Sequence, residues 1–212
     1  MCNTLQVRWI IAPKIAPQPW IVCSGCGGLR AFQSSDKIRL NANGRKLDAW
    51  LIYKCTTCSK TWNRSIFERK SVRDIDSATI EALQSNDPVW IRAEAFNLEA
   101  LRRKTERIDE FADLEVRKEL VRASPGWIRL EIELSVPFSA STRLDRLLAS
   151  ELPISRSRLS TLHENGLLQV SSDRPDILRR RIRNGLRITL DLSNLEDREP
   201  FWKLSAMTEV SD

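Results

Sequence analysis

The stretch Cys23-Ser-Gly-Cys26 is matched further along the chain by Cys55-Thr-Thr-Cys58, and these two motifs decide the predicted fold. A Cys-x-x-Cys motif places two thiolates on one tight turn, and two such turns close a tetrahedral metal site. Because Cys23, Cys26, Cys55 and Cys58 fill all four positions without a histidine, the set favours structural over catalytic zinc. We therefore expect one structural Zn²⁺ per chain. Two disulfides or four unrelated thiols are the alternative.

The 28 residues between the motifs predict a β-hairpin. Leu47-Asp-Ala-Trp-Leu-Ile-Tyr53 is typical of a strand, and Asn41-Ala-Asn-Gly44 before it is typical of a turn in which glycine supplies a positive φ. A hairpin between two Cys-x-x-Cys turns is the construction of a zinc ribbon. Cys2, the fifth cysteine, is interpreted as a spare thiol.

Charge is unevenly distributed along the chain, whose net charge is +6. Residues 1–60 carry nine Lys/Arg against two acids, and residues 141–190 carry ten against five, whereas residues 61–125 are close to neutral. Two separated basic segments suggest a polyanionic partner, although a positive charge that only aids solubility is the alternative. The basic residues expected to form a cationic hairpin face are Lys37, Arg39, Arg45 and Lys46.

The sequence predicts neither a membrane span nor a signal peptide. No stretch approaches the roughly 20 apolar residues that span a bilayer, and the N-terminus lacks the charged and apolar regions of a signal peptide. We expect a cytoplasmic protein with no membrane partner, in a compartment that keeps thiols reduced for metal binding.

Helical signals follow the second cysteine motif. Asp87 before Pro88 is an N-cap followed by proline at the first helical position. Residues 102–122 are densely and alternately charged, which we interpret as one or two solvated helices, and Trp127 to Leu134 alternates as a half-buried strand. The predicted organisation is a zinc ribbon at 1–70, a helical extension with a connecting strand at 71–136, a third module at 137–195 and a tail at 196–212.

The third module predicts two helices and two strands. The first helix starts at a capping-box-like pair, Thr142 and Asp145, and ends at Pro153, and the second runs from Ser155 to Asn165-Gly166. Residues 167–170 and 186–192 are the predicted strands.

The second of these helices carries Arg156 and Arg158 in its first turn. Cations are unfavourable there by some tenths of a kcal/mol each, because the macrodipole already places positive charge at this end. An external phosphate would explain them, and removing both should then leave the melting temperature equal or higher. The alternative is that they pair with Asp145, Glu151 or Glu164.

The same segment resembles the αL RNA-binding domain of ribosomal protein S-four over about fifty residues. The matching stretches are Arg143-Leu-Asp-Arg-Leu-Leu148, Ser155-Arg-Ser-Arg158, Leu162, Gly166-Leu-Leu-Gln-Val170, Arg181 to Gly185 and Ile188. Ser171-Ser-Asp173 stands where the family has a glycine turn, and Leu186 stands where it has an acidic residue. The resemblance implies structured RNA as the partner, and the expected contact residues here are Arg143, Arg146, Arg156, Arg158, Arg179, Arg180, Arg181 and Arg183.

The N-terminal part resembles an uncharacterised bacterial family, domain of unknown function 1062. The stretches that carry this resemblance are Cys23, Cys26, Lys37 to Gly44, Leu47 to Cys55, Cys58, Trp62 and Asn63. It implies a bacterial protein and brings no activity with it.

Nothing in the sequence predicts catalysis. His163 is the only histidine, and it is interpreted as a half-buried or RNA-facing side chain rather than a general base. No phosphate-binding glycine loop and no acidic cluster with metal spacing is present.

The sequence thus predicts an α+β protein: a zinc ribbon with a helical extension, then an αL-type domain. The expected function is non-catalytic binding of structured RNA, either ribosomal or transfer RNA. The ribosome is a candidate partner, and no small-molecule substrate is expected. The alternatives are a DNA-binding or transcription-associated ribbon, or a protein-interaction adaptor.

Overall fold

The computed structural model of the chain describes residues 3–123, 126–152 and 154–193. Cys2, Pro153 and the predicted tail at 196–212 lie outside these residues.

The chain divides into two compact units. Residues 1–14 join residues 112–212 in what we call the split unit, and residues 15–111 form the inserted unit. The sequence placed its boundaries at residues 70 and 136 instead. The division differs because the first strand of the chain pairs with strands that follow residue 112.

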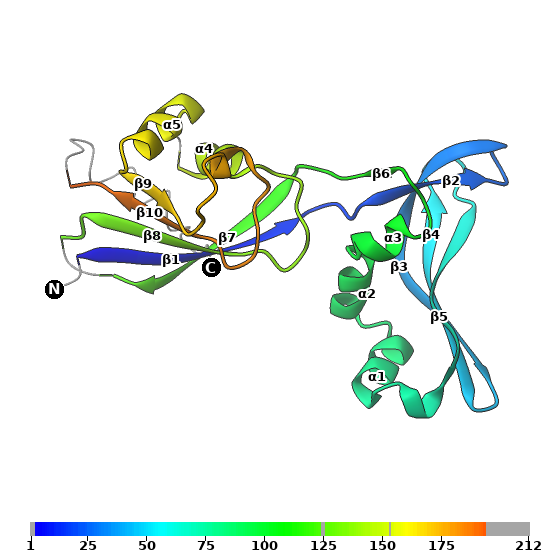
Figure 1. Cartoon of the computed structure of the whole chain (residues 1–212). Coiled ribbons are helices and arrows are strands. Elements are labelled where there is room, and N and C mark those ends of the chain that lie inside the picture. Colours follow the sequence, from blue (N-terminus) through cyan, green and yellow to red (C-terminus); the bar gives the residue numbers. More distant parts are fainter. Residues whose placement is uncertain (1–2, 124–125, 153, 194–212) are drawn as a thin grey trace, which may run out of the picture. The chain divides into compact units, whose positions relative to one another are not determined.

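The split unit contains one five-stranded sheet. Its strands are β1 Thr4–Pro13, β7 Leu114–Arg122, β8 Arg129–Ser135, β9 Leu168–Val170 and β10 Arg187–Asp191. They lie in the order β7-β1-β8-β10-β9 (Figure 1). β1 is antiparallel to β7 and parallel to β8, and β10 is antiparallel to both of its neighbours.

Two helices cover one face of this sheet: α4 Leu144–Glu151 and α5 Arg156–Glu164, with the short 3-10 helix η2 Ile177–Arg179 beside them (Figure 1). Alternate strand residues point at these helices and are buried, as the inward positions of β1 illustrate with Leu5, Val7, Trp9 and Ile11. The leucines of α4 and α5 pack on them, and the result is one continuous apolar core.

The inserted unit contains the second five-stranded sheet, in the order β5-β4-β3-β2-β6. Its strands are β2 Gln18–Cys23, β3 Gly28–Asn43, β4 Lys46–Cys55, β5 Thr61–Ser71 and β6 Ile108–Asp109. The 3-10 helix η1 Val72–Asp74 and three short helices follow β5: α1 Ser77–Ser85, α2 Pro88–Ala95 and α3 Leu98–Arg102. Leu51 and Tyr53 of β4 pack with Ile91, Ala95 and Leu101 in a smaller core.

The predicted fold class is wrong. The described residues form ten strands in two sheets, and no helix among them exceeds nine residues. The chain is therefore mostly β, and the expected helical extension over 71–136 is limited to α1–α3, after which come β6, β7 and β8.

The charged stretch 102–122 accounts for much of this error. Its second half is β7, which pairs along eight residues of β1. Leu114, Val116 and Lys118 alternate as half-buried positions, and Leu114 and Val116 pack against the core. The charges at the intervening positions hid this two-residue period, because dense alternating charge is also typical of a solvated helix.

Helix starts were predicted with mixed success. Asp87 caps α2 by accepting a hydrogen bond from the backbone N–H of Trp90 at 2.7 Å, and Ser155 caps α5 through the N–H of Arg158 at 3.2 Å. The capping box at Thr142 was wrong. α4 begins one residue later, and its N-cap residue is Arg143, whose side chain has no acceptor for a capping hydrogen bond. The Asp145 carboxylate instead accepts hydrogen bonds from arginines.

Candidate metal centre and cationic surface

The two cysteine motifs form the turns of neighbouring hairpins at the same end of the inserted-unit sheet. Cys23 ends β2 and Cys26 precedes β3, whereas Cys55 ends β4 and Cys58 precedes β5. β3 and β4 are adjacent and antiparallel, so the start of one lies beside the end of the other. The predicted hairpin between the motifs is thereby confirmed.

The two turns have the same backbone geometry. The N–H of Gly27 donates to the carbonyl of Cys23 at 2.9 Å, and the N–H of Ser59 donates to the carbonyl of Cys55 at 3.0 Å. Both donors have positive φ, +70° for Gly27 and +60° for Ser59. Each motif is therefore built as the same tight turn, although only the first has glycine at its left-handed position.

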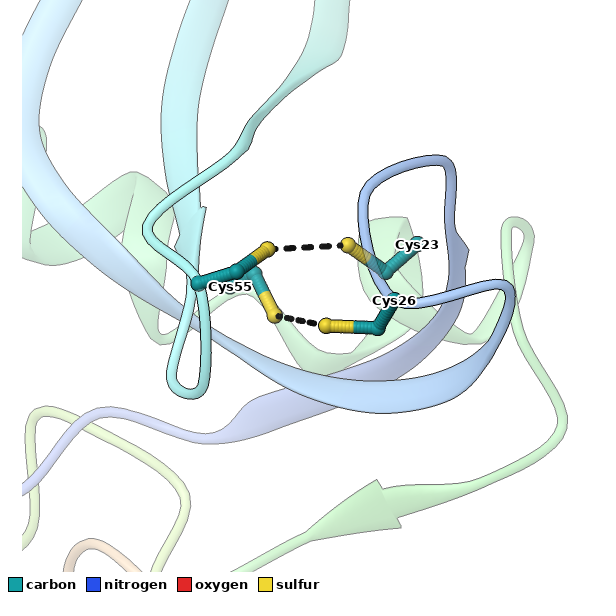
Figure 2. A group of neighbouring side chains, drawn as sticks. Cys23, Cys26 and Cys55 are labelled. Carbon is teal, nitrogen blue, oxygen red and sulfur yellow. Dashed lines mark hydrogen bonds between the residues drawn. The ribbon is translucent and has the colours of Figure 1, made fainter.

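The four sulfur atoms converge on one point (Figure 2). Cys23 Sγ lies 3.4 Å from Cys58 Sγ, Cys26 Sγ lies 4.0 Å from Cys55 Sγ, and all four lie within 4.8 Å of one another. A tetrahedral ion with Zn–S bonds of ~2.3 Å needs sulfurs ~3.8 Å apart. The observed spacing fits a four-coordinate metal, and the cysteines are free thiols rather than disulfides.

Gly25 makes this approach possible, a role that the sequence analysis missed. A Cβ at this position would lie 3.1 Å from Cys58 Sγ and 3.9 Å from Cys23 Sγ. A larger residue would therefore press on the ligand from the opposite turn. A glycine inside the x-x of a Cys-x-x-Cys motif was the available signal.

The thiols of the cluster differ in acidity. The pKa of Cys26 is raised to about 12, first because it shares a hydrogen bond with the Cys58 thiol and second because burial disfavours its thiolate. Burial is the largest influence on Cys55 and opposes its ionisation, but hydrogen bonds from the N–H groups of Cys58 and Thr57 and from neighbouring thiols outweigh it, so that its pKa falls to about 6. One ligand is thus ready to bind a cation near neutral pH.

The predicted cationic hairpin face lies on β3, β4 and their connecting turn. Lys37, Arg39, Arg45 and Lys46 are all exposed. The guanidinium of Arg39 lies 5.8 Å from the ring centroid of Trp50, opposite it in the strand register. The structure brings these four residues to one hairpin.

Three of the arginines expected to contact RNA have partners within the split unit. Asp145, which is only 5% exposed, accepts hydrogen bonds from Arg143 at 2.7 Å and from Arg156 at 3.0 and 2.7 Å. Arg180 pairs with Asp176 at 2.5 Å. For Arg156 this is the structural pairing that the sequence left open as the alternative to phosphate binding.

Four others differ. Arg146, Arg158, Arg179 and Arg183 are exposed, and within the described part of the chain none of them forms an ion pair. Arg181 is also exposed and forms a backbone bridge with Arg143.

His163 has a structural contact. Its Nδ1 lies 2.9 Å from the carbonyl of Leu168, so the ring connects the end of α5 to β9. Arg174, which the sequence analysis did not select, lines a cavity together with Arg180, Arg181 and Arg183. Its position six residues before Arg180 was the only available signal.

The sequence profile of the family described as "Protein of unknown function (DUF1062)" matches residues 40–174. The chain belongs to this family. The matched range includes Cys55 and Cys58 and most of the split-unit helices, and it begins after Cys23 and Cys26. No curated protein and no solved structure matches the chain. Among the described residues, no helix combines the length and apolar character that crossing a membrane requires.

Proposed function

We propose that this member of the DUF1062 family is a non-catalytic, zinc-containing protein that binds structured RNA through phosphate contacts. The metal is structural Zn²⁺, one per chain, because four thiolates at tetrahedral spacing leave no position for water or substrate. Zinc would stabilise the end of the inserted-unit sheet, where Cys23 and Cys55 extend a small apolar core.

The observation that carries the RNA proposal is a difference in charge pairing within the split unit. Most arginines on its strands face carboxylates: Arg8 pairs with Glu133, Arg129 with Asp191 and Arg187 with Glu131. In the helical layer and the loops beside it, Arg143, Arg156 and Arg180 are also paired, but four further exposed arginines have no carboxylate partner in the described part of the chain. These are Arg146, Arg158, Arg179 and Arg183.

Unpaired guanidiniums on one layer raise the local positive potential and suit phosphate, which they contact through two parallel N–H groups. The αL resemblance also supports the proposal. It leads us to expect two helices followed by a β-hairpin, with arginines beside them, in a protein that binds structured RNA.

The experiment is a binding titration of purified, zinc-loaded protein against total transfer RNA and against duplex DNA of similar length. We expect tighter binding to the folded RNA, with an affinity that falls steeply between about 50 and 200 mM salt. Equal binding to duplex DNA would favour the DNA-binding alternative. Salt-independent binding, or none, would contradict the proposal.

A further inference from the structure

A cavity of about 240 Å³ lies between the segment that follows β9 and the segment that precedes β10. The residues that line it include four arginines, Arg174, Arg180, Arg181 and Arg183, together with Ser171, Ser172 and Asn184. Among the residues that the structure describes, no carboxylate lines this cavity. Cations and hydrogen-bond donors are therefore concentrated there without an anion from the described part of the chain.

Several of these donors are available to a ligand. Arg180 is held by Asp176, but Arg174 and Arg183 form no ion pair with any residue that the structure describes. Ser171 Oγ accepts a hydrogen bond from the N–H of Arg187 at 2.9 Å, which leaves its hydroxyl hydrogen free to donate. The Ser172 hydroxyl, in the same turn, makes no hydrogen bond within the described residues.

Two other cavities of the split unit show that this composition is specific. One, lined by Arg122, Arg129, Glu131 and Asp191, mixes both signs of charge, and its Arg129 pairs with Asp191. Another includes the carboxylates of Asp145, Glu164 and Asp176. Carboxylates in a cavity repel an anion, so neither suits phosphate as the arginine-lined cavity does.

We infer that the arginine-lined cavity binds a single phosphate group, held by Arg174 and Arg183 with hydroxyl donors from Ser171 and Ser172. Guanidinium groups bind phosphate oxygens through paired, charge-assisted hydrogen bonds, and serine hydroxyls complete a tetrahedral oxyanion site. The serine turn stands where the αL resemblance expects glycine, so these side-chain donors distinguish this chain from that pattern. The inference rests on the proposed function for the source of the phosphate, a phosphodiester of the bound RNA.

The test compares two double variants with the wild-type protein. Arg174→Gln with Arg183→Gln removes the two cavity cations. Arg8→Gln with Arg117→Gln removes the same charge from exposed positions on β1 and β7 of the same unit. Binding is measured on an RNA stem-loop with a 5′-hydroxyl, so that every phosphate is a backbone diester.

We expect the cavity variant to bind about tenfold more weakly and to lower the slope of log affinity against log salt by about one, since both arginines serve one phosphate. The control variant should change the slope less. Ser172→Asp, which places a carboxylate in the cavity, should weaken binding to a similar extent and provides a second route if the arginine variant is unstable.

A titration of the wild-type protein with inorganic phosphate, followed by the amide NMR signals of Ser172 and Gly185, separates the two proposals. If RNA binds but the cavity variant and the control variant behave alike, the cavity inference is overturned and the proposed function stands. If no RNA binds but phosphate shifts the cavity amides, the proposed function falls and the cavity is a site for free phosphate. Absence of both effects overturns both.

Discussion

Asp145 Oδ2 accepts two hydrogen bonds from Arg156, from Nε at 3.0 Å and from Nη2 at 2.7 Å, and so connects the start of α4 to the start of α5. Asp145 is nearly buried, and its Oδ1 has no hydrogen-bond partner in the described residues. Arg158, two positions further along α5, has no ion-pair partner among the residues that the structure describes. Two arginines in the same helical turn therefore have different roles.

Separate substitution of these two arginines should show the difference. Arg156→Ala should lower the free energy of unfolding by about 1–2 kcal/mol, because a buried carboxylate loses charged hydrogen bonds and keeps only Arg143. Arg158→Ala should leave stability within about 0.5 kcal/mol, since it only removes a cation from the positive end of a helix. Chemical denaturation measures both. The expectation from sequence was that removing both arginines leaves the melting temperature equal or higher. A measurable loss of stability in Arg156→Ala would contradict it.

RNA binding should show the opposite order. Arg158→Ala should reduce the slope of log affinity against log salt by about one, as the loss of one phosphate contact does. Arg156→Ala should reduce it less, because its guanidinium already faces Asp145. A stable Arg158→Ala variant with wild-type affinity at low salt would remove this residue from the proposed RNA surface.

The elements with local signals were predicted well from sequence. The Cys-x-x-Cys turns, the hairpin between them and the Asp87 cap each depend on residues close together in the chain. The misplaced domain boundaries concern long-range pairing. The predicted zinc ribbon at 1–70 includes β1, but this strand pairs with β7 and β8, which lie more than 100 residues away. A two-residue period predicts that a strand exists and does not identify its neighbours.

The site was predicted to a similar extent. Spacing alone identified the four metal-ligand candidates, because the geometry of a Cys-x-x-Cys turn is fixed by its own residues. The ion pairs of the arginines could not be derived in this way. Whether Arg156 contacts Asp145 or a ligand depends on how α4 packs against α5. Composition and local spacing carry no information about this packing.

Metal content is the most direct prediction. Freshly purified protein should contain about one equivalent of zinc, and replacing any of Cys23, Cys26, Cys55 or Cys58 by Ser should remove it, because a tetrahedral site needs all four ligands. Gly25→Ala should weaken zinc binding without removing a ligand, since its Cβ crowds Cys58 Sγ. Gly28→Ala is the control for the metal site, because Gly28 lacks a positive φ and a Cβ there would make only an ordinary contact, with the Arg30 guanidinium at 3.8 Å. Elemental analysis that finds less than half an equivalent in the wild-type protein would contradict the assignment.

Zinc affinity should rise with pH, and the slope of log affinity against pH should itself change with pH. Each thiol must lose its proton to bind, so a ligand contributes to the slope only below its own pKa. Cys26, whose pKa is about 12, contributes throughout the working range, whereas Cys55, whose pKa is about 6, contributes only at lower pH. The slope of log affinity against pH should therefore decrease by about one as pH rises through 6. Competition with a chromophoric chelator from pH 5 to 8 measures it, and a flat profile would show that the ligands are not protonated thiols.

The hairpin face should contribute to RNA binding without affecting the fold. Arg45→Glu with Lys46→Glu reverses two exposed charges beside a polar turn, so the melting temperature should stay close to that of the wild type. RNA affinity should fall uniformly across sequences, because phosphate contacts carry no base information. Unchanged affinity at low salt would show that these residues do not contact RNA and would favour the alternative that they only aid solubility.

The last prediction concerns a buried ion pair of the inserted unit. Arg64, only 1% exposed, donates from Nη2 to Glu94 Oε2 at 2.6 Å and to the Glu94 carbonyl at 3.0 Å, and so connects β5 to α2. Glu94→Ala leaves this guanidinium buried without its carboxylate and should cost about 3 kcal/mol in the free energy of unfolding. Glu99→Ala, which breaks the exposed pair with Arg103, should cost under about 0.5 kcal/mol. Urea denaturation of both variants measures the difference, and equal losses would show that Arg64 finds another partner.

The double substitution Arg64→Met with Glu94→Met leaves no unpaired charge. It should therefore recover most of the stability lost in Glu94→Ala.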